Sequence, residues 1–160
     1  MIRSAQLDDV PTIASLIRDL ARYEKLEHEV VLDERLLREH LFGERPYAEV
    51  LIAESDARET VGFALFFHNY STFLGRPGIY LEDLFVKPEH RGRGYGKALL
   101  TRLAQLAVER GCRRLEWAVL DWNTPSIEFY RSLGAVPMDD WTTYRLTGDA
   151  LVSISRGVVG

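Results

Sequence analysis

The chain has 160 residues, of which 46% are hydrophobic and 28% are charged, the composition of an ordinary globular protein. Its net charge of −4 argues against a nucleic-acid partner, because such partners usually bind a broad basic surface. The sequence contains no run of eighteen apolar residues that would span a membrane, and its first ten residues lack the apolar core of a signal peptide. We therefore expect one domain, residues 1–160, in the cytoplasm and without membrane contact.

Cysteine and histidine usage argues against a metal site. Cys112 is the only cysteine, so the chain has no internal disulfide and no cysteine-based metal site. Its place between Gly111 and an expected strand favours a small buried residue over a nucleophile. The four histidines lack metal-ligand spacing such as H-E-x-x-H, and we predict no metal.

The N-terminal third predicts one short strand and two helices. Residues 2–5 are expected to form the strand, and two aspartates before Pro11 predict a helix start with an acid as the N-cap. Apolar residues at three- and four-residue steps continue this helix to about Tyr23. An acidic segment then leads to a second helix over about 34–42. These acids form either a solvated loop or a patch that attracts a cationic amine.

The middle of the chain predicts strands. Apolar runs at 49–54 and 60–68 suggest a hairpin, and the polar stretch 69–78, broken by glycine and proline, predicts a loop. Residues 79–86 then form a strand that carries two consecutive acids, Glu82 and Asp83.

A glycine-spaced basic loop, Arg91-Gly-Arg-Gly-Tyr-Gly-Lys97, joins this strand to a helix that ends near Gly111. Alternate glycines remove Cβ atoms and permit positive φ. The N–H groups and the dipole of the following helix face the same spot, where Arg91, Arg93 and Lys97 add positive charge. The pattern predicts a phosphate or pyrophosphate site, and its alternative is a flexible turn with solvated arginines.

Two common phosphate motifs do not match this loop. A P-loop needs four residues between its glycines and then Gly-Lys-Ser/Thr, which is absent. A dinucleotide fingerprint needs G-x-G-x-x-G directly after the strand, whereas residues 87–90 intervene here and the spacing is G-x-G-x-G. Glu116 lies at the right distance for a ribose ligand, but it sits inside an apolar strand and is discounted.

The C-terminal third predicts a strand over about 114–120, which makes the preceding helix a right-handed parallel crossover. Asn123 or Thr124 caps the next helix, Pro125 takes its first position and Gly134 ends it. A final strand is expected at about 142–146, and residues 148–160 are left unassigned. The fold class is α/β, with a mixed central sheet flanked by helices.

The glycine loop resembles the Q/R-x-x-G-x-G/A pyrophosphate motif of the GNAT superfamily of N-acetyltransferases. The stretches YLEDLFV at 80–86 and AVLDWN at 118–123, with Phe129-Tyr130, are similar to the diamine acetyltransferase group, which includes spermidine/spermine and thialysine enzymes. The similarity runs from about residue 2 to 146. It implies a GNAT-like acyl-CoA N-acyltransferase fold, acetyl-CoA as co-substrate, a small-molecule amine acceptor and a homodimer.

The resemblance also implies which residues contact acetyl-CoA. The backbone N–H groups at the end of the acidic strand would hold the pantetheine arm and stabilise the oxyanion. The implied cofactor-binding residues are Leu84, Phe85, Val86, Arg91, Gly92, Arg93, Gly94, Tyr95, Gly96, Lys97, Asn123, Ser126 and Tyr130.

The amine needs a base, because an alkylammonium with a pKa of about 10.4 has no lone pair. Strand alternation places Glu82 and Asp83 on opposite faces unless a bulge intervenes. The resemblance assigns the base to Glu82, an electrostatic role to Asp83 and amine binding to Tyr23 and Glu24. Tyr130 is either a core aromatic or the general acid, and the resemblance favours the acid.

The expected function is acetyl transfer to a primary amine by direct attack in a ternary complex, since Cys112 is not placed as a nucleophile. Polyamine enzymes carry an acid in the loop where this chain reads Tyr70-Ser-Thr-Phe73, and Asp139-Asp-Trp-Thr142 also departs from them. A thialysine- or lysine-like amino acid or a small diamine is therefore expected first, and a polyamine second. The alternatives are a non-catalytic acyl-CoA-binding module, an acetyltransferase acting on a peptide or other amine, and a dinucleotide-binding protein.

Overall fold

The structure is a computed structural model and describes residues 1–157. Backbone contacts divide the chain into two compact units, Met1–Ala118 and Val119–Gly160, and each is described by itself. That the whole chain forms one domain stays a prediction. Within residues 1–157, no helix combines the length and the apolar character needed to cross a membrane.

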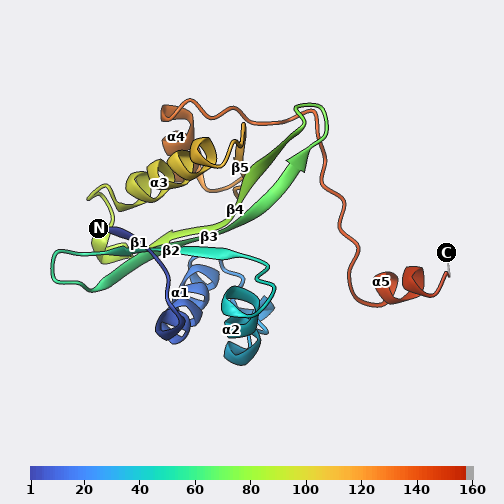
Figure 1. Cartoon of the computed structure of the whole chain (residues 1–160), viewed down its shortest axis with the longest axis horizontal. Helices are drawn as coiled ribbons and strands as arrows, with labels where there is room; N and C mark the ends of the chain where they lie inside the picture. The colour runs from blue at the N-terminus through green and yellow to red at the C-terminus, as the bar shows by residue number, and fades with distance from the viewer. Residues whose placement is uncertain (158–160) are drawn as a thin grey trace. The chain divides into compact units, whose positions relative to one another are not determined.

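The first unit is a five-stranded mixed sheet with helices on both faces, which confirms the expected fold class (Figure 1). Its strands, in their spatial order, are β1 (Ile2–Ser4), β2 (Glu49–Glu54), β3 (Thr60–Ser71), β4 (Arg76–Val86) and β5 (Leu115–Trp117). The first four are antiparallel neighbours, and β5 is parallel to β4, as the predicted crossover requires. Its helices are α1 (Val10–Tyr23), α2 (Glu34–Phe42) and α3 (Tyr95–Glu109), with 3₁₀ turns η1 (Leu7–Asp9), η2 (Glu27–Glu29) and η3 (Pro88–His90).

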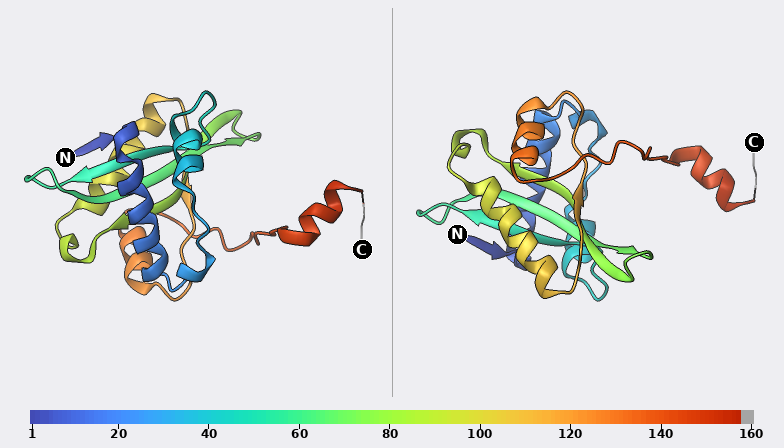
Figure 2. Two further views of the ribbon diagram at one scale, coloured as in Figure 1. Left: turned by 90° about the horizontal axis from the view of Figure 1, so that it is seen from below. Right: turned by 90° about the horizontal axis from the view of Figure 1, so that it is seen from above.

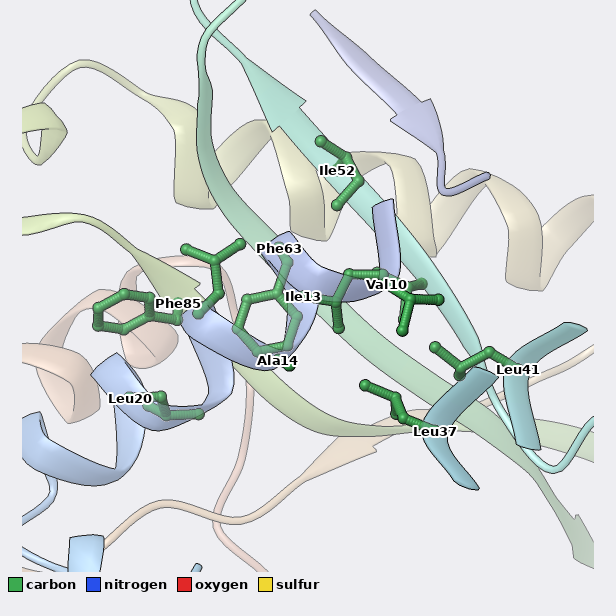
Figure 3. Packing of buried hydrophobic residues seen from close by; sticks show 11 residues of the cluster. Val10, Ile13, Ala14, Leu20, Leu37, Leu41, Ile52, Phe63 and Phe85 are labelled. Atoms are coloured by element: carbon green, nitrogen blue, oxygen red, sulfur yellow. The ribbon is translucent and has the colours of Figure 1, made fainter. Parts of the chain in front are cut away.

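The main core lies between the sheet and the α1–α2 pair. Apolar residues of α1 recur at helical spacing and therefore form one buried stripe, which includes Val10, Ile13 and Leu20. These side chains pack against Phe63 of β3 and Phe85 of β4 (Figure 3). Full burial of a residue of this size contributes about 1.5–3 kcal/mol. This core holds the end of α1 beside the end of β4.

Helix α3 covers the opposite face of the sheet (Figure 2). Its buried face comprises Leu99, Leu100, Leu103, Leu106 and Ala107. The chain leaves this helix through Gly111, at φ 73°, and Cys112 is buried as expected.

The start of α1 departs from expectation. Asp9 occupies the N-cap position, yet its side chain makes no capping hydrogen bond to α1. It accepts hydrogen bonds from the Arg3 guanidinium at 2.8 and 2.9 Å and from the Gln6 N–H at 2.7 Å. The hydrogen bonds from Arg3 hold the pKa of Asp9 below its usual value. The carboxylate therefore ties β1 to the turn before the helix.

Two expected elements of the first unit have different bounds. The loop predicted at 69–78 is wrong, because Asn69 pairs with Gly78 and Ser71 with Arg76, leaving a turn of residues 72–75. Polar residues form strand there since each strand supplies the other's ladder hydrogen bonds. The strand predicted at 114–120 is confined to β5, because pairing with β4 covers only Ile79 to Leu81.

The second unit contains α4 (Thr124–Ser132) and α5 (Gly148–Ser155). Asn123 caps α4 by accepting the Ser126 N–H at 3.4 Å, and Gly134 follows its end at φ 89°, both as predicted. The predicted strand at 142–146 is wrong: the segment has no regular structure and Tyr144 is 94% exposed. A strand requires a neighbour that accepts and donates ladder hydrogen bonds, and residues 1–157 provide none for it.

Candidate active site

Strand β4 carries a β-bulge at the two consecutive acids. Asp83 pairs with Leu65 and Leu81 with Phe66, so Glu82 is an extra residue without a partner on β3. Leu65 and Phe66 are consecutive and point to opposite faces, and therefore Leu81 and Asp83 do so too. Leu65 packs against the α1–α2 core, which places Asp83 on the α1 face.

Two other carboxylates, Glu82 and Glu24, act on Asp83. The pKa of Asp83 is raised to about 7, chiefly by burial and in smaller measure by the negative charges of Glu82 and Glu24. Burial also raises the pKa of Glu24, the C-cap residue of α1. The bulge thus places Asp83 on the α1 face, where the charges of Glu82 and Glu24 both act on it.

A fourth acid, Glu116 of β5, extends the group. It lies directly opposite Tyr80 in the parallel pairing and accepts a hydrogen bond from Asn69 Nδ2 at 3.4 Å. Burial raises the pKa of Tyr80, and the negative charges of Glu82 and then Glu116 contribute in smaller measure. Sequence reasoning discounted Glu116, and only the register between residues 79–81 and 115–117 could have shown its place.

The outer edge of β4 is open near the bulge. Within residues 1–118, β5 pairs with β4 only as far as Leu81, and no strand follows it along the outer edge from Glu82 to Val86. Backbone groups of residues 84–86 on that edge, other than the Val86 carbonyl, which accepts a hydrogen bond from Arg91, are therefore available to an extended ligand.

The loop before α3 has the geometry of an anion site. Gly92 and Gly94 adopt φ values of 76° and 87°, and a Cβ at either position would meet no atom within 4 Å. Gly94 is the N-cap of α3 and provides no side-chain cap, so the N–H groups of the first turn stay open to a ligand. An open cavity of about 410 Å³ adjoins this turn. Its lining residues are Ile2, Gly94, Lys97, Ala98, Thr101, Arg102 and Gln105. Open space, helix N–H groups and cationic side chains fit the phosphates of acetyl-CoA.

Arg91, a predicted phosphate ligand, points toward α1. Its Nε donates a hydrogen bond to the Val86 carbonyl at 2.9 Å. Its guanidinium carbon lies 4.5 Å from the centre of the Tyr23 ring and 5.6 Å from that of Phe85.

The remaining predicted site residues lie in the second unit. Asn123 is buried, with 5% of its surface exposed, and Ser126 follows in the first turn of α4. Tyr130 lies on the same helix, with its ring centre 5.7 Å from that of Phe129. Helix α4 thus gathers these three residues. Separately, residues 1–157 contain no group of three His, Cys, Asp or Glu side chains that could hold a metal ion.

Comparisons with known proteins identify the class. A family model described as "Acetyltransferase (GNAT) family" matches residues 13–135. The chain is 42% identical to the thialysine N-epsilon-acetyltransferase of Bos taurus, over 94% of both chains. It is 35% identical to the L-ornithine N5-acetyltransferase of Arabidopsis thaliana, over 97% of this chain and 87% of that one. A solved V. cholerae integron cassette protein is similar in structure, with a TM-score of 0.81, 26% identity and coverage of 98% of this chain and 97% of that one.

The fold, the family match and these relatives define the protein as an N-acetyltransferase. The chain belongs to the GNAT acetyltransferase family.

Proposed function

We propose that the protein transfers the acetyl group of acetyl-CoA to the side-chain amine of a small molecule that carries a second positive charge. A thialysine- or lysine-like amino acid or a diamine is the first candidate, and a polyamine is the second. The observation that carries this proposal is the group of four acids, Glu24, Glu82, Asp83 and Glu116, beside the open edge of β4. Its relatives act on thialysine and ornithine, which both combine a side-chain amine with an α-amino group.

Acetyl-CoA supplies the activated acetyl group as a thioester. Arg93, Lys97 and the N–H groups at the start of α3 would hold its phosphates, since Lys97 lines the open cavity and Gly92 and Gly94 face open space. The backbone of residues 84–86 would pair with its extended arm and donate hydrogen bonds to the acyl carbonyl. Asn123 and Ser126 are assigned to the same ligand.

Glu82 is the proposed base that removes the ammonium proton, directly or through a water molecule. It is exposed at the bulge and therefore reachable by a substrate. Asp83 is a second candidate, because a carboxylate with a pKa near 7 is partly ionised at neutral pH and in that form can accept a proton. Tyr130 is the proposed acid that donates its phenol proton to the leaving sulfur. The amine attacks directly, without an acetylated enzyme.

We further propose that Glu116 binds the second charge of the substrate. Replacing Glu116 by Gln is expected to raise the KM of lysine, thialysine or ornithine about three- to tenfold, the range of one lost charge-assisted contact. The KM of a monoamine should not change, because it has no second charge. Glu44→Gln, which removes an exposed carboxylate in the loop after α2, is the matched control. An equal effect of Glu116→Gln on the monoamine would contradict the assignment.

Three expectations of the sequence remain proposals. The protein forms a homodimer, and exposed apolar residues of the second unit such as Trp141 and Val136 support this. It works in the cytoplasm. It binds neither nucleic acid nor membrane.

The experiment that tests the function measures CoA release from acetyl-CoA with thialysine, lysine, ornithine, spermidine, putrescine and a peptide with a free N-terminus. Turnover led by the diamino acids would support the proposal. Turnover led by spermidine would shift the assignment to polyamines, and turnover led by the peptide would refute a small-molecule substrate. Tight acetyl-CoA binding without turnover of any amine would favour a binding module.

A further inference from the structure

The backbone of Arg91 is part of the glycine loop, whereas its side chain lies against the end of α1, where the amine is proposed to bind. Its N–H donates a hydrogen bond to the Pro88 carbonyl at 3.2 Å, which fixes it at the start of the loop. Its Nε is bonded to the Val86 carbonyl at 2.9 Å, at the end of β4. The backbone of Arg91 thus belongs to the loop, and its side chain is anchored to the end of β4, the two segments that would hold acetyl-CoA.

The face of the guanidinium lies over the end of α1. Its carbon is 4.5 Å from the Tyr23 ring centre, within the range of a cation–π interaction. Tyr23 is the last residue of α1 and Glu24 is its C-cap, after which Lys25, at φ 61°, turns the chain away. A residue that fixes the Tyr23 ring thus also fixes the backbone that carries Glu24.

We propose that Arg91 is a positioning residue that couples the acetyl-CoA loop to the amine-binding end of α1 through its contact with Tyr23. The inference rests on the proposed function and adds a link between its two substrate sites. A ligand that orders the loop orders Arg91, which in turn holds Tyr23 and Glu24 in place for the amine. By thermodynamic linkage, a bound amine tightens acetyl-CoA binding by the same factor.

Hydrogen exchange tests this link without any need for turnover. Saturating acetyl-CoA, checked by calorimetry, is expected to slow amide exchange over residues 20–26 in the wild type and not in Arg91→Ala. Arg93→Ala removes another cation of the loop, whose side chain makes no hydrogen bond, ion pair or cation–π contact with α1 within residues 1–157, and should still show the slowing at saturation. Equal protection of residues 20–26 in Arg91→Ala and the wild type would overturn the inference, and would leave Arg91 as a phosphate ligand only.

Kinetics test whether the effect passes through Tyr23. Arg91→Ala is expected to raise the amine KM about two- to fivefold at saturating acetyl-CoA, as for the loss of one exposed cation–π contact. The same factor should remain in a Tyr23→Phe background, which keeps the aromatic face, and vanish in Tyr23→Leu. An unchanged factor in Tyr23→Leu would overturn the route through Tyr23.

Failure of the inference is distinguishable from failure of the proposed function. If the wild type binds acetyl-CoA and acetylates no amine, the function fails and the exchange comparison alone decides on the coupling. If the wild type does not bind acetyl-CoA, both are overturned.

Discussion

Asp83 is the side chain whose surroundings differ most from what the sequence predicts. The bulge at Glu82 sets its side chain on the α1 face, where the charges of Glu82 and Glu24 act on it. It is half-buried and faces two further negative charges, so its ionised form is disfavoured. Ionised Asp83 is therefore electrostatically unfavourable, and a bound ammonium group would stabilise it.

This cost makes the free energy of unfolding depend on pH. The folded-state pKa of Asp83 is about 7, above the usual value of 3.8. Ionisation of this group therefore destabilises the fold progressively as pH rises from about 4 to about 7. Because one pKa unit is worth about 1.4 kcal/mol, Asp83→Asn should gain at least about 1 kcal/mol over the wild type between pH 4 and pH 8.

Urea unfolding across this pH range measures the gain. Glu89→Gln, which removes an exposed acid in η3, controls for net charge and should show no pH-dependent difference from the wild type. A constant difference between Asp83→Asn and the wild type at all pH values would contradict the raised pKa.

The base is tested by the pH dependence of turnover. Glu82→Gln is expected to slow acetylation at least about 100-fold, the usual contribution of general base catalysis, and most at low pH, where few amines are neutral. If Asp83 is the base, Asp83→Asn instead removes the rise in rate near pH 7 from the pH–rate profile. A pH–rate profile unaltered by Glu82→Gln would exclude Glu82.

At the scale of elements, the open N-terminus of α3 carries the cofactor assignment. Gly94 lies at φ 87°, where a side chain costs about 1–2 kcal/mol, and its position faces open space. Gly94→Ala is expected to raise the KM of acetyl-CoA about tenfold or more, because the loop must distort or the Cβ meets the ligand. Initial rates at saturating amine measure this effect.

The turn between β3 and β4 offers a matched control. Gly75 also has positive φ, at 62°, and a Cβ there meets nothing within 4 Å. Gly75→Ala should therefore lower the melting temperature to a similar extent and leave the KM of acetyl-CoA unchanged. Equal KM values for both variants would remove the loop before α3 from cofactor binding.

Elements with a strong local pattern were predictable. Helices α1, α2 and α3 have apolar stripes at helical spacing, and their observed bounds agree with the prediction to within a few residues. The long β3–β4 hairpin was missed beyond His68, because polar strand residues are stabilised by their partners across the ladder and carry no local signal.

At the scale of the whole molecule, the exposed apolar side chains of the second unit predict an interface with a second copy of the chain. Trp141 is 78% exposed, and Leu151, Val152 and Ile154 of α5 are exposed as well. Sedimentation equilibrium is expected to give a mass of twice 18.3 kDa. Trp141→Ser with Ile154→Ser should weaken the association, because burial of such side chains contributes about 1.5–3 kcal/mol each. A monomer mass at micromolar concentration would contradict the homodimer.

The sequence by itself determined the α/β class, the glycine loop at the start of α3, the capped helix after Asn123 and the pair of acids in β4. Each depends on neighbours within a few residues, through caps, helical spacing or glycine conformations, and such local interactions can be predicted from the sequence. Only the tertiary structure decided that a bulge at Glu82 sets Asp83 on the α1 face, that Glu116 lies opposite Tyr80, and that Arg91 reaches Tyr23. Those facts depend on strand register and on packing between segments far apart in sequence, where a shift of one residue moves a side chain to the other face.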